Sequence, residues 1–480
     1  MDLRSWAQGL LIALLTTAAG AQVALSPSHY ELGVELDYTR EELQATARIV
    51  LSNPSAEPQR TASLLLYRLL RVRAASDDHG HDLAFTQAVV AFEDFAKLQV
   101  NQIVVTLADP LAPGAQTAIS LQYGGFLLGY AETGMRYVQD RIDPELTILR
   151  DDSFAYPLPG HPSRAVNRSA PEASFTYSAR ITVPSGLVVA NGGRLEATDT
   201  RGDKVTYRFS SLKPSWRMDF VIARYTRLSS GTIHVYHLPG DGAGAAAVAQ
   251  AAAKAMALFG VWFGPLAEEA ELTFIEIPDG WGSQADVTTV IQSAAAFRDP
   301  SRHREVYHEI SHLWNVRATD RPSPRWNEGL ASFLEFLAAQ ELTGERVVDA
   351  RATQLVDWLR QELPGHPAWR KIPLADYGRN GLTDLSYSVG ALFFDLLYRL
   401  AGKETFNAII RKYAADFGGR GGSTKDLAET IRKTASIDLS PLLTDWLFTT
   451  GWTERIAHDA GIAELAAWYG RGGHAGQERP

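Results

Sequence analysis

The sequence predicts a multidomain α and β protein in which an N-terminal antiparallel β domain is followed by an α/β domain that becomes helical. Eight segments between residues 29 and 228, one of which is residues 63–72, alternate apolar and polar residues between turn-forming Gly, Pro, Asn and Asp. This is the pattern of half-buried strands. Residues 240–264 are rich in alanine and predict a helix, which two short strands follow. From residue 335 onward, apolar residues recur at helical spacing almost to the end.

The domain boundaries follow from changes in this pattern. We place the β domain, which we expect to be sandwich-like, at residues 22–228 and the second domain at residues 229–470. Residues 140–171 show no clear period and predict a long loop across the β domain. The polar segment 471–480 is predicted to be a disordered tail.

The first 21 residues have the composition of a secretory signal peptide. They contain one arginine, an apolar core from Leu10 to Ala19 and the small-x-small triplet Ala19-Gly20-Ala21. A membrane anchor is the competing interpretation, but the apolar run is well short of the ~20 residues that a spanning helix needs. We therefore expect a mature chain that begins near Gln22, has no stable membrane span, and is exported to the periplasm or secreted.

The composition of the chain excludes several classes of protein. Its 480 residues are 45% apolar and carry a formal charge of −9, as in ordinary soluble globular proteins. No basic run or aromatic-basic stripe predicts nucleic-acid binding. The absence of cysteine excludes disulfides and thiol chemistry, so histidine and carboxylate side chains are the candidate ligands for a metal ion.

The motif H-E-x-x-H occurs once in a predicted amphipathic helix, as His308, Glu309 and His312. Histidines four residues apart lie one turn apart on the same helix face, so both can reach one tetrahedral zinc ion. The opposite face of this helix is apolar and comprises Val306, Ile310, Leu313 and Trp314. Surface helices also carry this motif by chance. A helix with one apolar face and with both histidines on the opposite face favours a zinc site.

The next predicted helix supplies a third candidate ligand, Glu328. It falls opposite the apolar face of that helix, which comprises Leu330, Phe333, Leu334 and Leu337. Three protein ligands leave the fourth position of a tetrahedral zinc ion for water, as in catalytic rather than structural sites. Glu309 would then be the general base that takes the proton from this water.

With these residues in place, the chain resembles the aminopeptidase N family of gluzincin zinc metallopeptidases. The family motifs appear as HEISHLW, WNEGLASFLE and Tyr387-Ser388-Val389-Gly390, while HLWNVR is similar to the glycyl aminopeptidase family. The resemblance implies a thermolysin-like catalytic domain, one Zn²⁺ ion and peptide substrates. It also implies that Tyr387 stabilises the oxyanion of the tetrahedral intermediate, with Tyr377 as the rival candidate. Glu335, two turns after Glu328, could accept the second N–H of a zinc-bound histidine.

Two departures from the family pattern concern substrate recognition and subfamily. Fifteen residues separate His312 from Glu328. In the aminopeptidase N pattern, the segment between the second histidine and the glutamate is about three residues longer. The family's G-x-M-E-N strand, whose glutamate binds the substrate amine, is replaced by residues 279–286. Backbone pairing of a peptide along Gly280, Trp281 and Gly282 needs no particular side chain. Asp286 and Glu276 are the candidate substitutes for the missing glutamate.

These observations predict an exported zinc metallopeptidase, with an aminopeptidase as the first hypothesis. A zinc endopeptidase, or another zinc hydrolase that does not recognise a free amine, is the alternative. A non-catalytic zinc-binding protein is a third, which Glu309 and Tyr387 disfavour because a binding scaffold needs neither. The oligomeric state does not follow from the sequence.

Overall fold

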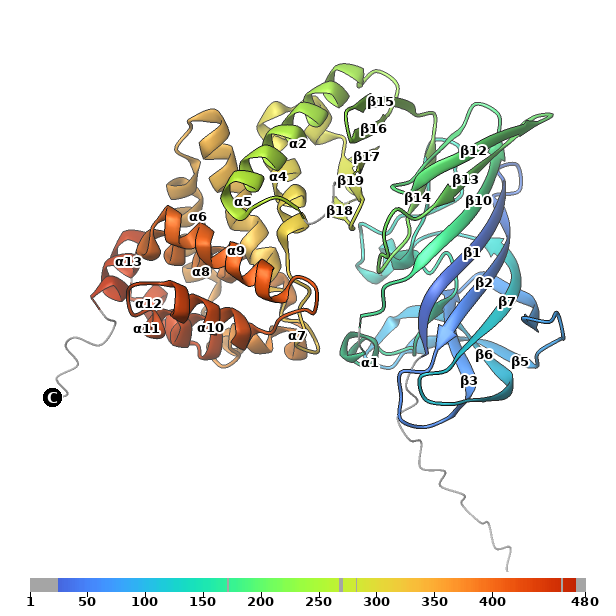
Figure 1. The fold of residues 1–480 in the computed structure, drawn as a ribbon, viewed down its shortest axis with the longest axis horizontal. Helices are drawn as coiled ribbons and strands as arrows, with labels where there is room; N and C mark the ends of the chain where they lie inside the picture. Colours follow the sequence, from blue (N-terminus) through green and yellow to red (C-terminus); the bar gives the residue numbers. More distant parts are fainter. Residues whose placement is uncertain (1–24, 171, 267–270, 282, 459–460, 472–480) are drawn as a thin grey trace, which may run out of the picture.

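The computed structural model describes residues 25–170, 172–266, 271–281, 283–458 and 461–471. The predicted signal peptide, residues 472–480 of the predicted tail and Gly282 lie outside this part of the chain. Figure 1 shows strands gathered in the N-terminal half and helices in the C-terminal half. The predicted fold class is thereby confirmed.

Three sheets form the N-terminal half. The seven-stranded sheet has the order β12 (Arg194–Arg201), β13 (Lys204–Ser210), β10 (Thr176–Pro184), β1 (Ser26–Asp37), β2 (Glu42–Ser52), β7 (Gln116–Phe126) and β4 (Leu70–Asp77). The four-stranded sheet has the order β5 (Phe85–Phe92), β6 (Phe95–Leu111), β3 (Gln59–Tyr67) and β9 (Leu158–Pro159). The three-stranded sheet has the order β11 (Val188–Ala190), β14 (Phe220–Ala223) and β8 (Thr147–Leu149). The short helix α1 (Arg164–Ser169) follows β9.

The strands of this half alternate as their sequences predict, and their inward residues share one apolar core. Leu64 and Ile49, from the two larger sheets, are both completely buried in it. Neighbouring strands are antiparallel except for β1 and β10, which run parallel. The predicted antiparallel domain therefore contains one parallel pair, because the crossover from β9 through α1 returns the chain beside its first strand.

Two strand predictions in this half are corrected. Residues 63–72 were expected to form one strand, but β3 and β4 divide them between two sheets. No Gly, Pro, Asn or Asp marks the turn at Arg68-Leu69, so the apolar run conceals it. Strand β5 was not expected, because its central Ala-Val-Val-Ala breaks the alternation of apolar and polar residues. The predicted loop at residues 140–171 contains the short elements β8, β9 and α1.

The second half begins with a five-stranded mixed sheet. Its order is β15 (Thr226–Ser230), β16 (Ile233–His237), β17 (Leu272–Ile277), β19 (Thr289–Ser293) and β18 (Gln284–Ala285). Strand β15 spans the boundary that we placed after residue 228, and it pairs with β16. The two-residue strand β18 ends the sheet at the edge nearest the helices α4 and α5 (Figure 1).

Helices make up the rest of this half (Figure 1). They are α2 (Gly242–Phe263), α3 (Ala295–Arg298), α4 (His303–Ser311), α5 (Trp326–Thr343), α6 (Val347–Glu362), α7 (Tyr377–Asn380), α8 (Ser386–Ala401), α9 (Lys403–Phe417), α10 (Thr424–Thr434), α11 (Ser440–Leu443), α12 (Gly451–Ala457) and α13 (Ile462–Gly470). Among the described residues, only α2 is long and apolar enough to cross a membrane. Its buried face, which includes Val248 and Phe259, belongs to the main core, so α2 acts here as a core helix.

Candidate metal and catalytic site

Helix α4 presents the H-E-x-x-H motif at the surface of the core. Asp299 initiates the preceding turn by accepting a hydrogen bond from the backbone N–H of Ser301, as the sequence Asp-Pro-Ser predicts. Val306 and Ile310 are completely buried, which fixes the rotation of the helix. The α-helix ends at Ser311, so His312 opens a short 3₁₀ turn that continues to Trp314.

Helix α5 begins two residues before Glu328 and lies against α8. Gly329 and Gly390 allow the close approach of these helices, since a Cβ added to Gly329 would lie 2.5 Å from Cα of Gly390. Arg325 precedes the helix in the left-handed conformation, with φ of 58°. This packing brings Tyr387, in the first turn of α8, beside Glu328.

The structure brings His308, His312 and Glu328 together. Glu328 Oε2 lies 3.5 Å from Nε2 of His308 and 3.4 Å from Nε2 of His312, and the ligand atoms of all three residues lie within 4.8 Å of one another. Tetrahedral zinc with bonds of about 2.0–2.1 Å separates its ligand atoms by about 3.3–3.4 Å. The three side chains therefore fit a zinc ion without rearrangement of the backbone.

The charges of these ligands depend strongly on one another. Burial opposes the ionisation of Glu328, but hydrogen bonds from His308 and His312 and the charge of Arg325 hold its pKa well below the usual value. Burial also disfavours the charged form of His308, but Glu328 and Glu335 outweigh it and raise the pKa of His308 to about 10. In the metal-free protein a proton on His308 thus takes the place of the cation.

The remaining nitrogen of each histidine also has a partner. Glu335 Oε2 lies 3.5 Å from Nδ1 of His308, and Glu335 Oε1 lies 3.0 Å from Nε of Arg304. The side-chain amide of Asn315 hydrogen-bonds Nδ1 of His312. Both imidazole rings are therefore held with Nε2 directed toward Glu328, the orientation that a metal site needs.

The two tyrosines proposed for the oxyanion differ sharply in position. The ring of Tyr387 stacks on His308 with centroids 6.2 Å apart, and Arg325 Nη2 donates to its hydroxyl at 3.3 Å. Burial, reinforced by Glu328, raises the pKa of Tyr387, so its hydroxyl stays protonated and can donate. Tyr377 is completely buried, and its hydroxyl has no hydrogen-bond partner among the described residues.

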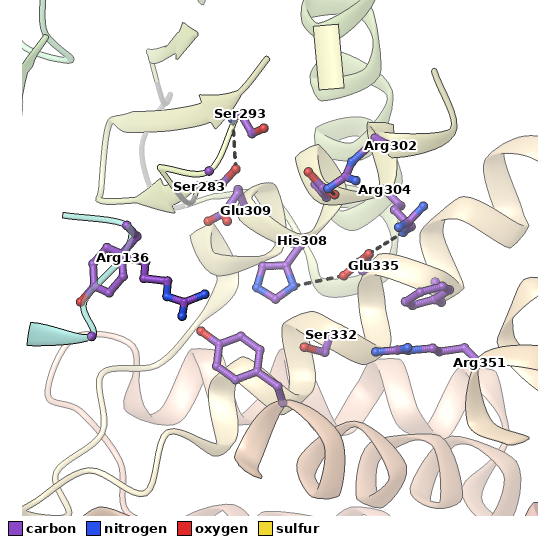
Figure 2. A pocket seen from close by; sticks show the side chains of 16 residues that line it. Arg136, Ser283, Ser293, Arg302, Arg304, His308, Glu309, Ser332, Glu335 and Arg351 are labelled. Carbon is purple, nitrogen blue, oxygen red and sulfur yellow. Dashed lines mark hydrogen bonds and ion pairs between the residues drawn. The ribbon is translucent and has the colours of Figure 1, made fainter. Parts of the chain in front are cut away.

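A cavity of about 770 Å³ opens in front of these groups and is lined by His308, Glu309 and Tyr387. Figure 2 shows Glu309 on the side of His308 that faces Ser283, which lies next to the edge strand. Burial raises the pKa of Glu309, although His308 and His312 oppose this effect. Glu309 is thus a carboxylate beside the ligands but outside the group of ligand atoms, as a general base requires.

The edge-strand residues expected to contact a peptide have different environments. Gly280 lines the cavity, with φ of 92°, whereas the side chain of Trp281 is buried in a separate apolar cluster with Ile148 and Ile277. Gly282 lies outside the described residues. Of these three, the described part of the chain brings only Gly280 to the cavity.

Neither candidate substitute for the amine-binding glutamate lines this cavity. Glu276 is completely buried, accepts a hydrogen bond from the backbone N–H of Leu238, and has its pKa raised to about 8, mainly by burial. Asp286 accepts hydrogen bonds from the backbone N–H groups of Thr288 and Thr289. Both carboxylates therefore have structural partners away from the ligands.

Sequence reasoning missed the positive charge around the site. Arg325 donates to Oε1 of Glu328 at 2.6 Å, and four further arginines line the cavity, namely Arg136, Arg302, Arg304 and Arg351. Helical spacing could have found two of the five, since Arg304 precedes His308 by one turn and Arg325 lies three residues before Glu328. Arg136 comes from a loop of the β half, and no local pattern indicates its place.

Comparison with solved structures supports this description of the fold. A variant of the M1 zinc metallopeptidase from Deinococcus radiodurans, with a bound Tyr-Ser-Ala substrate, has a TM-score of 0.63 and 21% identity, over 88% of this chain and 94% of that chain. Another structure of the Deinococcus radiodurans peptidase has the same TM-score and 22% identity, over 89% and 94% of the two chains. The chain has the fold of the M1 zinc metallopeptidases.

A curated relative points to the same family. Residues of this chain match the mitochondrial aminopeptidase 2 of Saccharomyces cerevisiae with 24% identity over 277 residues, which cover 52% of this chain. The match spans 29% of the length of the yeast protein. No protein-family model matches the chain. The predicted resemblance to the aminopeptidase N family is thereby confirmed by both the fold and the sequence.

Proposed function

We propose that this M1-type chain is a zinc-dependent metallopeptidase that acts as an aminopeptidase. The observation that carries the proposal is the arrangement of His308, His312 and Glu328 at zinc-ligand distances, with Glu309 and Tyr387 beside them on one cavity. A structural zinc site would need neither of the last two residues. Peptide as the substrate class agrees with the bound Tyr-Ser-Ala in the Deinococcus radiodurans structure.

When bound by His308, His312 and Glu328, zinc would polarise the scissile carbonyl and lower the pKa of its water. The residues of the chain divide the remaining tasks. Glu309 takes a proton from the attacking water and delivers it to the leaving amine. Tyr387 donates its hydroxyl proton in a hydrogen bond to the oxyanion, in a position that Arg325 holds through its own hydrogen bond.

Hydrolysis of matched peptides with free and N-acetylated ends tests this proposal. An aminopeptidase cleaves the free peptides, and acetylation abolishes cleavage because the amine can no longer bind as a cation. The Glu309→Gln variant, loaded with zinc, serves as the control for a contaminating peptidase. Failure of folded, zinc-loaded protein to cleave either peptide would contradict the proposal and favour a zinc-binding role without catalysis.

An endopeptidase is the second candidate, and a specific observation favours it. The described carboxylates that line the cavity are Glu305, Glu309 and Glu335. Arg302 neutralises Glu305, and Glu335 is shared by His308 and Arg304. Glu309, which is needed as the base, is the remaining acceptor for an amine. Equal cleavage of the free and acetylated peptides would establish the endopeptidase.

Export is a further part of the proposal and rests on the signal-like pattern of residues 1–21. Expression of the full chain in a bacterial host, followed by fractionation and mass spectrometry, tests it. We expect a periplasmic or secreted product that begins near Gln22. A full-length product that stays with the cytoplasmic fraction would contradict export.

A further inference from the structure

One end of the cavity carries positive charge that the proposed reaction does not use. The guanidinium carbons of Arg304 and Arg351 lie 5.7 Å and 5.2 Å from the centroid of the Phe336 ring, and all three residues line the cavity together with His308. Figure 2 shows Arg304 and Arg351 on one side of His308 and Arg136 on the other. A peptide placed over His308 would therefore extend toward Arg351 in one direction.

The charges at this end of the cavity are not balanced. Glu335 forms an ion pair with Arg304, and Glu305 forms one with Arg302. Within the described ranges, no carboxylate forms an ion pair with Arg351, although this side chain is half-buried. Burial, opposed by Glu335 and reinforced by Arg304, lowers the pKa of Arg351. Glu335, the carboxylate that acts on Arg351, is already shared by Arg304 and His308. A partly dehydrated cation with no carboxylate of its own is unfavourable, and an anionic ligand would relieve this cost.

A carboxylate, the anion that ordinary peptides carry, matches this position. The planar guanidinium binds both carboxylate oxygens at once, and the Phe336 ring, which both guanidinium groups approach, offers an apolar surface to the methylene groups that carry the carboxylate. The cavity, at about 770 Å³, has room for a short peptide beside His308.

We propose that Arg351 binds a carboxylate of the peptide substrate, so that the enzyme prefers peptides that place a carboxylate at this end of the cavity. This inference rests on the proposed peptidase function and names its substrate class. The carboxylate has two possible sources, an Asp or Glu side chain next to the scissile bond or the free C-terminus of a short peptide. Both sources have the same chemistry, and matched peptides distinguish them.

The test is calorimetric binding to the zinc-loaded Glu309→Gln variant, so that peptides bind without being cleaved. The pairs are Glu-Ala-Ala with Gln-Ala-Ala, Ala-Glu-Ala with Ala-Gln-Ala, and Ala-Gln-Ala with its C-terminal amide. We expect the acidic member of at least one pair to bind about tenfold or more tightly than its neutral partner, as for a hydrogen bond to a charged group. The pair that shows the difference identifies the source.

Substitutions in the same background assign the preference to Arg351. Arg351→Met should reduce the difference in affinity between the acidic and the neutral peptide to less than about twofold. Arg351→Lys keeps the charge but not the planar guanidinium, and it should retain part of this difference. Arg346→Met, an exposed position just before the same helix, is the matched control and should leave it unchanged. Equal binding within every pair, no binding of any peptide, or an undiminished preference in Arg351→Met would overturn the inference.

This design separates the inference from the proposed function. If the parent protein hydrolyses neutral peptides but no pair differs in binding, the function stands and the inference fails. If acidic peptides bind through Arg351 but the parent hydrolyses none of them, carboxylate recognition stands and the peptidase proposal fails.

Discussion

The two sides of the cavity are built in different ways. On the helix side, α4, α5 and α8 place His308, Glu328 and Tyr387 through helical spacing and one close helix contact. On the opposite side, Arg136 comes from a loop of the β half (Figure 2). Gly280, which also lines the cavity, comes from a turn beside the edge strand. The helix side carries the groups for the reaction, whereas the strand side lacks the expected amine-binding carboxylate among its described residues.

This difference indicates that reaction and substrate choice are separable in this molecule. Helical periodicity places His308 and His312 on one face of α4 and Glu328 opposite the apolar face of α5, and these placements can be read directly from the residues. Groups that select the substrate lie on loops and on separate helices, where they can change without disturbing the metal ligands. Changes around the metal ligands on α4, α5 and α8 should therefore alter rate, metal binding or stability, in a definite order of size.

After the loss of the general base in Glu309→Gln, the largest effect that we predict on the helix side follows from Tyr387→Phe. Loss of one oxyanion donor should lower kcat by about 10²- to 10³-fold, while zinc content stays unchanged because the hydroxyl is outside the ligand group. Steady-state kinetics with metal analysis of the same samples measures both quantities.

Tyr377→Phe is the matched control for this experiment. Its hydroxyl is buried and has no hydrogen-bond partner among the described residues, so its removal should leave kcat within about twofold of the parent. An equal loss of rate in both variants would contradict the role of Tyr387.

A smaller effect is predicted for Glu335→Gln. Loss of the carboxylate that accepts from Nδ1 of His308 should weaken zinc binding by about 10- to 100-fold. Competition with a chelator measures the affinity, and Glu341→Gln, an exposed position on the same helix, is the control. Zinc affinity equal to that of the parent would show that Glu335 does not support the ligand.

The close contact between α5 and α8 should contribute to the free energy of unfolding. In Gly329→Ala the new methyl group meets the backbone of Gly390, which should lower the free energy of unfolding by about 1–3 kcal/mol. In Gly260→Ala, within α2, the methyl group meets nothing within 4 Å, so this control should gain about 0.5–1 kcal/mol. Chemical denaturation of both variants measures these two changes in the free energy of unfolding, which should have opposite signs. A loss of stability of similar size in the control would contradict the role of the contact.

The last effect concerns pH in the metal-free protein. Because the pKa of His308 is raised to about 10, its protonation stabilises the fold fully below about pH 6.5. This contribution is lost as the pH rises through 10. The melting temperature of metal-free protein should therefore fall between pH 6.5 and 10 by a few degrees more than that of zinc-loaded protein, where the metal replaces the proton. Parallel curves in differential scanning calorimetry would show that His308 carries no such proton.

Much of the helix side could be predicted from the sequence, and little of the strand side. The apolar residues Val306 and Ile310 determine which face of α4 is buried, so the positions of His308 and His312 follow from local spacing. The environments of Trp281 and Glu276 depend instead on tertiary packing against β8 and Leu238, which no local period records. The split between β3 and β4 was missed for a related reason, since continuous apolar residues conceal a turn.

The most direct test of zinc-dependent catalysis is a titration of metal-free protein with zinc, in which peptide hydrolysis and bound metal are measured together. We expect activity to rise linearly and to saturate at about one zinc ion per chain. Glu309→Gln should bind the same amount of zinc and lose activity by about 10²- to 10⁴-fold. Hydrolysis that is independent of zinc, or a Glu309→Gln variant as active as the parent, would contradict zinc-dependent catalysis with Glu309 as the base.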